Sequence, residues 1–281
     1  MTWGVWGTNF SAANARKYIE QCLDLGITTF DHADIYGHYT TEELFGEATN
    51  GAHSLRQKMQ LITKCGIKLT TPNRPSFKIK SYDTSKEHIL HSVDTSLKNL
   101  KTDYIDLLLI HRPSPLMQPT EIAEAFLQLK QDGKVLHFGV SNFTPSQFEM
   151  LNSYHPLMTN QVKASLLHRD PFLDGTFDQC LQHKIAPMAY STMASGKFFS
   201  AEPDTTIKRI QKIGTDLAEQ YNATYEEILT AWLLKHPAKI FPIMGSTKIQ
   251  RMQAAVNALA VDMTREEWFM LWQAAVGEEV P

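Results

Sequence analysis

Short hydrophobic runs alternate with amphipathic stretches along the whole chain. Each run is almost continuously apolar, which is the pattern of a parallel strand that is covered on both faces. Strands are predicted over residues 1–6, 27–31, 60–64, 105–111, 135–141, 159–163, 185–190 and 240–244. Because parallel strands need long crossover connections, the stretches between them are expected to be mainly helical.

Those stretches place hydrophobic side chains at helical spacing. Helices are predicted over residues 12–25, 85–100, 119–132, 205–236 with a break around 222–224, and 264–276. Ser85 is expected to cap the second of these helices, because a serine hydroxyl can accept a hydrogen bond from a backbone N–H of the first turn. Strand and helix therefore alternate from one end of the chain to the other.

This alternation predicts an α/β protein, a (β/α)8 TIM barrel in one domain over residues 1–281 with an extra C-terminal helix. A doubly wound sheet is the second possibility, but no G-x-G-x-x-G sequence opens a helix after any predicted strand. Since the first predicted strand begins at or near Met1, the barrel either lacks an N-terminal closing hairpin or is closed by another element.

Composition narrows the class of protein. The chain is 43% hydrophobic and 20% charged, with a formal net charge of −3 and scattered basic residues, so no nucleic-acid partner is expected. No apolar run approaches the roughly 20 residues of a membrane span, and no secretory signal opens the chain. Three cysteines without CxxC spacing argue against a disulfide framework or a zinc site. We expect a cytoplasmic protein without a metal.

An acid, a base and a histidine end three of the predicted strands. These residues are Asp31, Lys64 and His111, and Tyr36 lies just past the first strand. In a barrel of parallel strands, active sites are built at this edge. An ammonium beside a tyrosine favours the phenolate and lowers the pKa of the phenol, while a carboxylate balances the ammonium. The four groups suit chemistry that delivers a proton to a carbonyl oxygen.

Each of these residues also has an ordinary structural interpretation. Tyr36 alone is a half-buried loop aromatic, Lys64 a lysine whose ammonium reaches solvent, and His111 a side chain that satisfies backbone groups. Only their joint occurrence favours catalysis. Residues 68–84, which follow Lys64, are rich in Pro, Asn, Ser, Thr and Lys. They are read either as a lid or substrate-contacting loop or as a disordered insertion.

Short motifs along the whole chain resemble those of the aldo-keto reductases, most closely the monomeric bacterial oxidoreductases of that family. The motifs are Phe30–Gly37 (Phe-Asp-x-Ala-x-x-Tyr-Gly), Thr63–Gly66, Leu108–His111, Gly133–Val135, Gly139–Phe143, Asn160–Val162, Ala189–Ser191 and Pro242–Ser246. They occur in the family's order and at plausible spacing, so the resemblance covers essentially the entire sequence.

The resemblance implies an NADPH-dependent reductase of aldehyde or ketone carbonyls, acting as a monomer on small molecules. Tyr36 would be the general acid, with Lys64 and Asp31 lowering its pKa and His111 orienting the carbonyl. Trp6, just beyond the first predicted strand, would face the mouth of the barrel and contact the substrate together with Tyr36 and His111.

The resemblance also implies residues that hold the cofactor. Ser141, Asn142 and Gln161 would hold the nicotinamide carboxamide, Tyr190 would stack on its ring, and Ser191, Met193 and Gly196 fall where the family wraps the pyrophosphate. Amide side chains offer the donors and acceptors that a carboxamide needs. The ordinary interpretation of Asn142 is a helix cap before Thr144.

A further segment is expected to hold the distal end of the cofactor. Gly245, Ser246, Thr247 and Lys248 precede a predicted helix that carries Arg251. Helix N-terminal amides with hydroxyls and a guanidinium form an anion site, which favours NADPH, with its 2′-phosphate, over NADH. The alternative is a solvated basic helix start. Ala254–Ala255 departs from the Glu-Asn pair that meets the adenine in many family members.

Other functions fit parts of this pattern. A non-catalytic NADP(H)-binding module could sense redox state, although binding alone needs no acidified phenol. A barrel aldolase would use Lys64 as a Schiff-base lysine. A metal-dependent hydrolase is disfavoured because no H-x-H pair ends a predicted strand.

Overall fold

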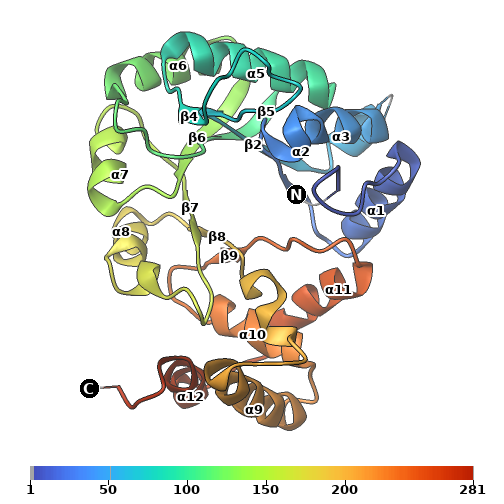
Figure 1. Cartoon of the computed structure of the whole chain (residues 1–281), viewed down its shortest axis with the longest axis vertical. Coiled ribbons are helices and arrows are strands. Elements are labelled where there is room, and N and C mark those ends of the chain that lie inside the picture. The colour runs from blue at the N-terminus through green and yellow to red at the C-terminus, as the bar shows by residue number, and fades with distance from the viewer. Residues whose placement is uncertain (1–2, 51, 281) are drawn as a thin grey trace. The chain divides into compact units, whose positions relative to one another are not determined.

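Parallel strands followed by helices dominate the computed structural model of the chain, which describes residues 3–50 and 52–280 (Figure 1). The chain divides into two compact units, residues 1–160 and 161–281. No helix in the described ranges is long and apolar enough to cross a membrane. The single domain expected from the sequence stays a prediction.

Unit 1 contains a parallel sheet. Its strands follow the order β1 (Thr29–Asp31), β2 (Gln60–Cys65), β5 (Ile105–Ile110) and β6 (Val135–Ser141). Phe30 pairs with Leu61, and Leu108 pairs with Phe138. Most residues of β2 and β5 are buried, as expected for strands that helices cover on one face and other strands' side chains on the other. The strands predicted over residues 27–31, 60–64, 105–111 and 135–141 are confirmed.

Helices connect these strands. They are α1 (Ala12–Asp24), α2 (Tyr36–Tyr39), α3 (Thr41–Thr49), α4 (His53–Arg56), α5 (Lys86–Leu100), α6 (Pro119–Gln131) and α7 (Pro145–Asn152). Ser85 caps α5 as predicted, since its side chain accepts from the N–H of His88. The apolar face of α6 is fully buried through Ile122 and Phe126, and each such side chain contributes roughly 1.5–3 kcal/mol.

The segment after β2 is a hairpin. It consists of β3 (Ile67–Lys68) and β4 (Ser81–Tyr82), which pair antiparallel, with an inner bridge between Thr71 and Arg74. The N–H of Asp83 donates to the carbonyl of Gly66 (3.0 Å), which closes the base of the hairpin. The enlarged loop predicted over residues 68–84 therefore has a defined backbone.

The strand predicted over residues 1–6 is wrong for its described part, residues 3–6, which form bends and turns. The N–H of Gly7 donates to the carbonyl of Gly4 (3.0 Å), and that of Phe10 to the carbonyl of Trp3 (2.7 Å). Trp3 is buried and its ring stacks on that of Phe45 at 5.9 Å. Aromatic packing and a glycine turn thus override the apolar pattern. Residues 1–2 lie outside the described residues.

Unit 2 contains the strands β7 (Asn160–Lys163), β8 (Met188–Tyr190) and β9 (Phe241–Pro242), also parallel and in that order; the first residue of β7 closes unit 1. Its helical segments are η1 (Asp170–Phe172), α8 (Thr176–His183), η2 (Ala194–Phe199), α9 (Thr205–Gln220), α10 (Tyr225–Leu234), α11 (Ile249–Asn257), η3 (Ala258–Ala260) and α12 (Arg265–Val276). The last three predicted strands are confirmed, each shortened at one or both ends.

The helices of the C-terminal third match the predicted ones. Residues 205–236 form two helices, and Asn222, with a φ of 49°, lies in the break. The final helix is α12, which lies beside α9 (Figure 1). It is fixed by Trp268, whose ring stacks on that of Trp232 at 4.9 Å while each indole N–H donates to the other's backbone carbonyl.

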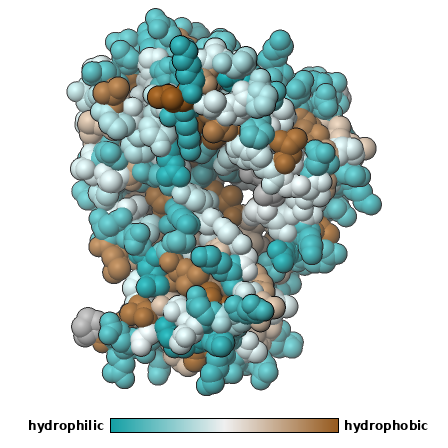
Figure 2. All heavy atoms as spheres, in the orientation of Figure 1, coloured by the Kyte–Doolittle hydropathy of each residue, from teal (hydrophilic) through white to brown (hydrophobic). Residues whose placement is uncertain are grey.

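The face of the molecule drawn in Figure 2 is mainly hydrophilic. On this face, hydrophobic residues are scattered among polar ones. Scattered apolar side chains are normal on a folded protein and mark no interface by themselves.

Candidate active site

The carboxyl ends of three strands of unit 1 lie next to one another. Asp31 is the last residue of β1 and pairs with Ile62 of β2. Lys64 is next to last in β2, and His111 directly follows β5. The N–H of His111 donates to the carbonyl of Cys65 (2.9 Å), which continues the ladder past the strands. The register therefore brings the three predicted side chains to one edge.

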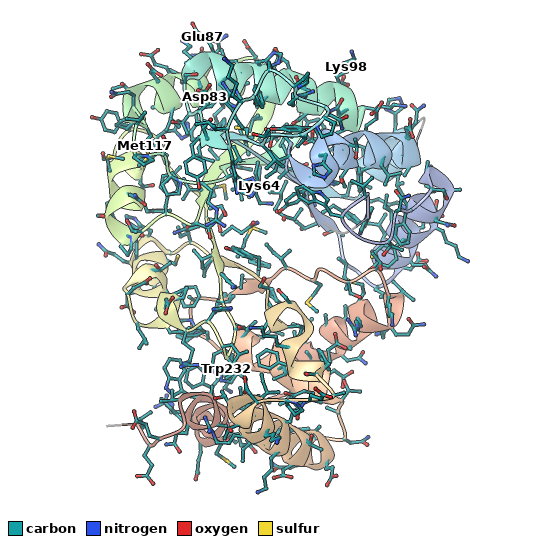
Figure 3. All side chains as sticks on the ribbon, viewed as in Figure 1. Lys64, Asp83, Glu87, Lys98, Met117 and Trp232 are labelled. Carbon is teal, nitrogen blue, oxygen red and sulfur yellow. The ribbon has the colours of Figure 1, made fainter. Side chains whose placement is uncertain are left out.

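The Lys64 ammonium is the centre of this edge (Figure 3). Its Nζ donates to Asp31 Oδ2 (2.6 Å) and to the carbonyl oxygen of His32 (2.7 Å). The Tyr36 hydroxyl lies 3.3 Å from the same Nζ. The Lys64 side chain is fully buried and that of Asp31 is 12% exposed, so water replaces neither partner easily. Three acceptors match the three N–H donors of an ammonium.

This environment keeps Lys64 charged. Burial lowers the pKa of Lys64, but the charges and hydrogen bonds of Asp31 and Tyr36 outweigh burial and raise the pKa above its ordinary value. A permanent ammonium next to a phenol stabilises the phenolate form of that phenol. The arrangement thus supplies a tyrosine that can give up a proton.

The His111 ring lies next to the Tyr36 ring. The two ring centroids are 6.0 Å apart and the planes nearly perpendicular. Burial, then the charge of Lys64, lowers the pKa of His111 well below its ordinary value, so the imidazole is neutral at pH 7. Its Nδ1 is buried without a hydrogen-bond partner in the described chain. A neutral imidazole can donate one hydrogen bond to a substrate oxygen without competing for the proton.

The turn that carries Tyr36 has an unusual backbone. The three residues after Tyr36 have left-handed φ values, 59° at Gly37, 58° at His38 and 69° at Tyr39. A Cβ at Gly37 would lie 2.5 Å from Thr41 Oγ1, so only glycine fits there. For the other two residues, this backbone costs roughly 1 kcal/mol each.

The hairpin of β3 and β4 holds this turn. The Tyr39 hydroxyl accepts from the N–H of Leu69 (2.8 Å) and donates to the carbonyl of Ile67 (3.3 Å). Asn73 Nδ2 donates to the carbonyl of His38 (2.7 Å). These bonds compensate for the backbone strain beside Tyr36. Sequence reasoning missed the role of Tyr39, whose only signal is its place three residues after the candidate acid.

Trp6 lies beside the same turn. Its ring centroid is 6.3 Å from that of Tyr36 and 5.2 Å from that of His38. The indole is 42% exposed, which leaves a large apolar face next to the candidate proton donor. The substrate contact of Trp6 stays a prediction.

Ser141 and Asn142 stand at the end of β6. Asn142 Nδ2 donates to Ser141 Oγ (2.8 Å) and lies 3.5 Å from the carbonyl of His111, so both residues border the site. Asn142 does not cap α7, because Thr144 forms that cap. Asn160, which opens the motif Asn160–Val162 but has no role assigned to it from the sequence, holds this loop: its Nδ2 donates to the carbonyl of Phe143 (2.8 Å).

In unit 2, Gln161 and Tyr190 lie on neighbouring strands. Gln161 is buried in β7 opposite Met188, with its Nε2 3.9 Å from Met188 Sδ. Tyr190 ends β8 and is half-buried. Beyond it the chain turns, with a φ of 55° at Ser191 and 87° at Gly196. The N–H of Gly196 donates to the carbonyl of Met193 (2.8 Å), so the predicted pyrophosphate segment forms one short loop.

The predicted anion segment precedes α11. Lys248 is the N-cap residue of α11 and no side chain caps the helix, while the N–H of Arg251 donates to the carbonyl of Lys248 (3.0 Å). The Ser246 hydroxyl accepts from the N–H of Lys248 (3.1 Å). Arg251 lies 3.8 Å from Glu226 Oε2 and 5.5 Å from the Phe199 ring centre, so its guanidinium is only partly neutralised.

These residues fit a nicotinamide dinucleotide. A Cβ added at Gly196 or Gly245 would meet no atom within 4 Å, which leaves the room that a pyrophosphate needs to approach the backbone. The α11 N-terminus together with Arg251 suits a phosphate. In the described ranges, no group of three or more His, Cys, Asp or Glu side chains could hold a metal ion.

Comparison with known proteins gives one consistent result. The Aldo/keto reductase family matches residues 1–275. The oxidoreductase YcsN of Bacillus subtilis is 48% identical over 99% of this chain and 94% of its own length. The oxidoreductase YdhF of Escherichia coli is 47% identical over 99% of this chain and 93% of its own length. A 6-dehydroglucose reductase of Agrobacterium fabrum is 41% identical over 100% of this chain and 95% of its own length.

A solved structure is also similar. It is the crystal structure of a thermostable aldo-keto reductase in complex with the inhibitor epalrestat, with a TM-score of 0.79, 26% identity, and coverage of 97% of this chain and 93% of the other. Together with the alternation of parallel strands and helices, this similarity confirms the predicted fold class, an α/β protein of the (β/α)8 barrel type. The resemblance seen in the sequence motifs is confirmed as well.

Proposed function

This chain belongs to the aldo/keto reductase family of oxidoreductases, and from that premise we propose that it reduces aldehyde or ketone carbonyls to alcohols with NADPH. The contact of the buried Lys64 ammonium with Asp31 and Tyr36 is the observation that carries the proposal. A binding protein has no need of an ammonium held against a phenol. For this reason we favour an enzyme over a redox-sensing module.

The residues of unit 1 would handle the proton. NADPH, when bound, supplies the hydride that reaches the carbonyl carbon. The carbonyl oxygen then carries negative charge and takes the proton from the Tyr36 hydroxyl. Lys64 stabilises the phenolate that remains, and Asp31 keeps the ammonium charged and oriented. Neutral His111 donates to the same oxygen and directs it toward Tyr36. The phenolate regains its proton from solvent.

The other candidate residues would hold the cofactor. Asn142, beside Ser141, offers an amide to the nicotinamide carboxamide, as does Gln161 from β7. Tyr190 offers an aromatic face to the ring. The loop over residues 191–196 and the segment 245–248 would take the phosphates, and Arg251 the 2′-phosphate, which favours NADPH over NADH.

A Schiff-base aldolase is less well supported. Its lysine must be a neutral amine when it attacks the carbonyl. Lys64 has three acceptors around its Nζ and a raised pKa, so it stays an ammonium. The geometry thus favours a lysine that acts by its charge. Location in the cytoplasm and a monomeric state remain predictions from the sequence.

The proposal is tested by following the absorbance of NADPH with a panel of aldehydes, ketones, quinones and sugars. The panel includes 6-dehydroglucose, because one relative is named a 6-dehydroglucose reductase. We expect NADPH to be oxidised in proportion to alcohol formed, with no adduct to Lys64 on borohydride treatment. Failure to oxidise NADPH with every carbonyl of the panel, although NADPH binds, would favour the sensing module instead.

A further inference from the structure

A carboxylate lies beside Arg251, the residue that we propose to hold the 2′-phosphate of the cofactor. Arg251 Nε is 3.8 Å from Glu226 Oε2. The Arg251 side chain is 42% exposed and that of Glu226 is 16% exposed, so the carboxylate is the more buried member of the pair. Burial raises the pKa of the Glu226 carboxyl, while the charge of Arg251 opposes that rise. The proton transfer and the cofactor contacts that we propose leave Glu226 without a role.

Two helices of unit 2 hold this pair in place. Glu226 is the second residue of α10 and Arg251 the third residue of α11, and the two helices pack side by side (Figure 1). Asn257 Nδ2 donates to Glu227 Oε1 (2.8 Å), which ties α11 to α10. The backbone carbonyl of Glu226 accepts from Thr230 Oγ1 (2.9 Å). Helix packing, and not a loop, therefore brings the two charges together.

The two acidic residues at the start of α10 use their carboxylates differently. The Glu227 carboxylate accepts from the N–H of Thr224 (2.7 Å) and from Asn257, so it belongs to the structure of the helices. For the Glu226 carboxylate, the contact with Arg251 is the one ion pair or hydrogen bond within the ranges that the structure describes. At 3.8 Å it is longer than a direct hydrogen bond between such charged groups, which measures about 2.7–2.9 Å. Glu226 thus keeps acceptor capacity for a ligand.

Arg251 is also held by weak contacts. Its guanidinium lies 5.5 Å from the ring centre of Phe199, the last residue of η2, and Phe199 is itself 38% exposed. A guanidinium has several N–H donors, and a ring face with one distant carboxylate leaves most of them available. The guanidinium can therefore turn from Glu226 toward a phosphate without breaking a strong bond.

A carboxylate and a guanidinium recognise the two nicotinamide cofactors differently. NADPH carries a phosphate on the 2′ oxygen of its adenosine ribose, where NADH has a hydroxyl. In other dinucleotide sites an arginine accommodates the phosphate, whereas an acidic side chain accepts a hydrogen bond from the hydroxyl. A site for NADPH alone needs only the arginine, and a carboxylate close to it weakens phosphate binding because like charges repel.

We propose that Glu226 gives the protein a second cofactor, NADH, by accepting a hydrogen bond from the 2′-hydroxyl of its adenosine ribose. The inference rests on the proposed function, because it needs the adenosine end of the cofactor to lie at Arg251. With NADPH, the guanidinium turns to the 2′-phosphate and Glu226 opposes that phosphate. With NADH, Glu226 accepts from the hydroxyl while Arg251 balances the charge of the carboxylate. NADPH stays the preferred cofactor, and NADH is bound as well.

Direct binding to the intact protein tests the proposal without any carbonyl substrate. Isothermal titration calorimetry gives the dissociation constants of NADPH and NADH for the unsubstituted protein and for Glu226→Gln, which keeps the size of the side chain and removes its charge. In Glu226→Gln the affinity for NADH should fall about tenfold, the value of one hydrogen bond to a charged group. The affinity for NADPH should stay the same or rise, because the repulsion of its phosphate is removed.

The chain offers a matched control in α12. Glu266 is the second residue of α12, as Glu226 is of α10, and both helices begin with a capping box. Glu266 is exposed, and α12 packs against α9. Glu266→Gln should leave both dissociation constants unchanged. Glu226→Asp, which keeps the charge on a shorter side chain, should lose less NADH affinity than Glu226→Gln. The melting temperature of each variant checks its folding.

The outcomes separate this inference from the proposed function. A protein that binds NADPH but shows no measurable binding of NADH overturns the second cofactor. A Glu226→Gln variant whose affinities for the two cofactors change by the same factor overturns the role of the carboxylate. Both results leave carbonyl reduction with NADPH intact. If neither cofactor binds the unsubstituted protein, the proposed function itself fails.

Discussion

At the scale of single residues, the main feature of the site is the buried ammonium of Lys64, which Asp31 holds in an ion pair. The sequence predicts the side chains of this arrangement, because Asp31, Lys64 and His111 each end a hydrophobic run that is visible as a strand. It does not predict that the carbonyl of His32 is the third acceptor for Lys64. A backbone acceptor leaves no trace in residue identity, and only the register of the strands creates it.

Substitutions in the ion pair of Lys64 and Asp31 should affect stability and activity differently. Asp31→Asn should lower the free energy of unfolding by about 3 kcal/mol, because it leaves a buried ammonium without its counter-charge. Adding Lys64→Met removes that ammonium and should restore most of the stability but none of the activity. Urea unfolding and NADPH oxidation measure the two effects. A double variant as unstable as Asp31→Asn alone would contradict the role of the charge.

At the scale of elements, the ends of helices are predicted well where a capping residue and the hydrophobic pattern indicate the same position. The Ser85 cap and the break at Asn222 were both predicted and both found. The strand expected over residues 1–6 failed in its described part because Trp3 packs on Phe45, a contact across many residues that periodicity cannot reveal. For the hairpin after β2 the sequence predicts only an enlarged loop, since the strands of the hairpin are short and its stabilising bonds go to the turn after β1.

The bond between Tyr39 and the hairpin should position the candidate acid. Tyr39→Phe keeps the ring but leaves the N–H of Leu69 without its acceptor, which should cost about 1 kcal/mol of stability. We expect kcat to fall severalfold with KM little changed, because the turn that carries Tyr36 loses support. The exposed Tyr82 of β4 provides the control Tyr82→Phe. If both variants keep full kcat, the hairpin does not position Tyr36.

At the scale of the whole molecule, the order of motifs predicted the family and the fold class, and both are confirmed. The reason is that barrel topology places strand ends in chain order, so motif order carries spatial information. The preference for NADPH over NADH is harder to predict from the sequence than the family is. Arg251 is close to Glu226, and the balance between this carboxylate and a phosphate decides how much of its charge a ligand receives.

Cofactor choice can be measured on the intact chain. A ligand at about 100 times its Kd adds about 2.7 kcal/mol to the stability of the folded state, so NADPH should raise the melting temperature. We expect NADH at the same concentration to raise it less. Arg251→Ala should make the two cofactors nearly equal, whereas Arg265→Ala on α12 should not. Equal losses of NADPH and NADH affinity in Arg251→Ala would remove the assignment of the 2′-phosphate.

The central claim is that Tyr36 gives the proton while Lys64 holds its phenolate. The most direct test is the rate of NADPH oxidation by Tyr36→Phe with a reactive aldehyde, at a cofactor concentration at which binding is shown to be complete. The account predicts a loss of about 100-fold or more with NADPH affinity unchanged. A rate within a few fold of the unsubstituted protein would contradict it.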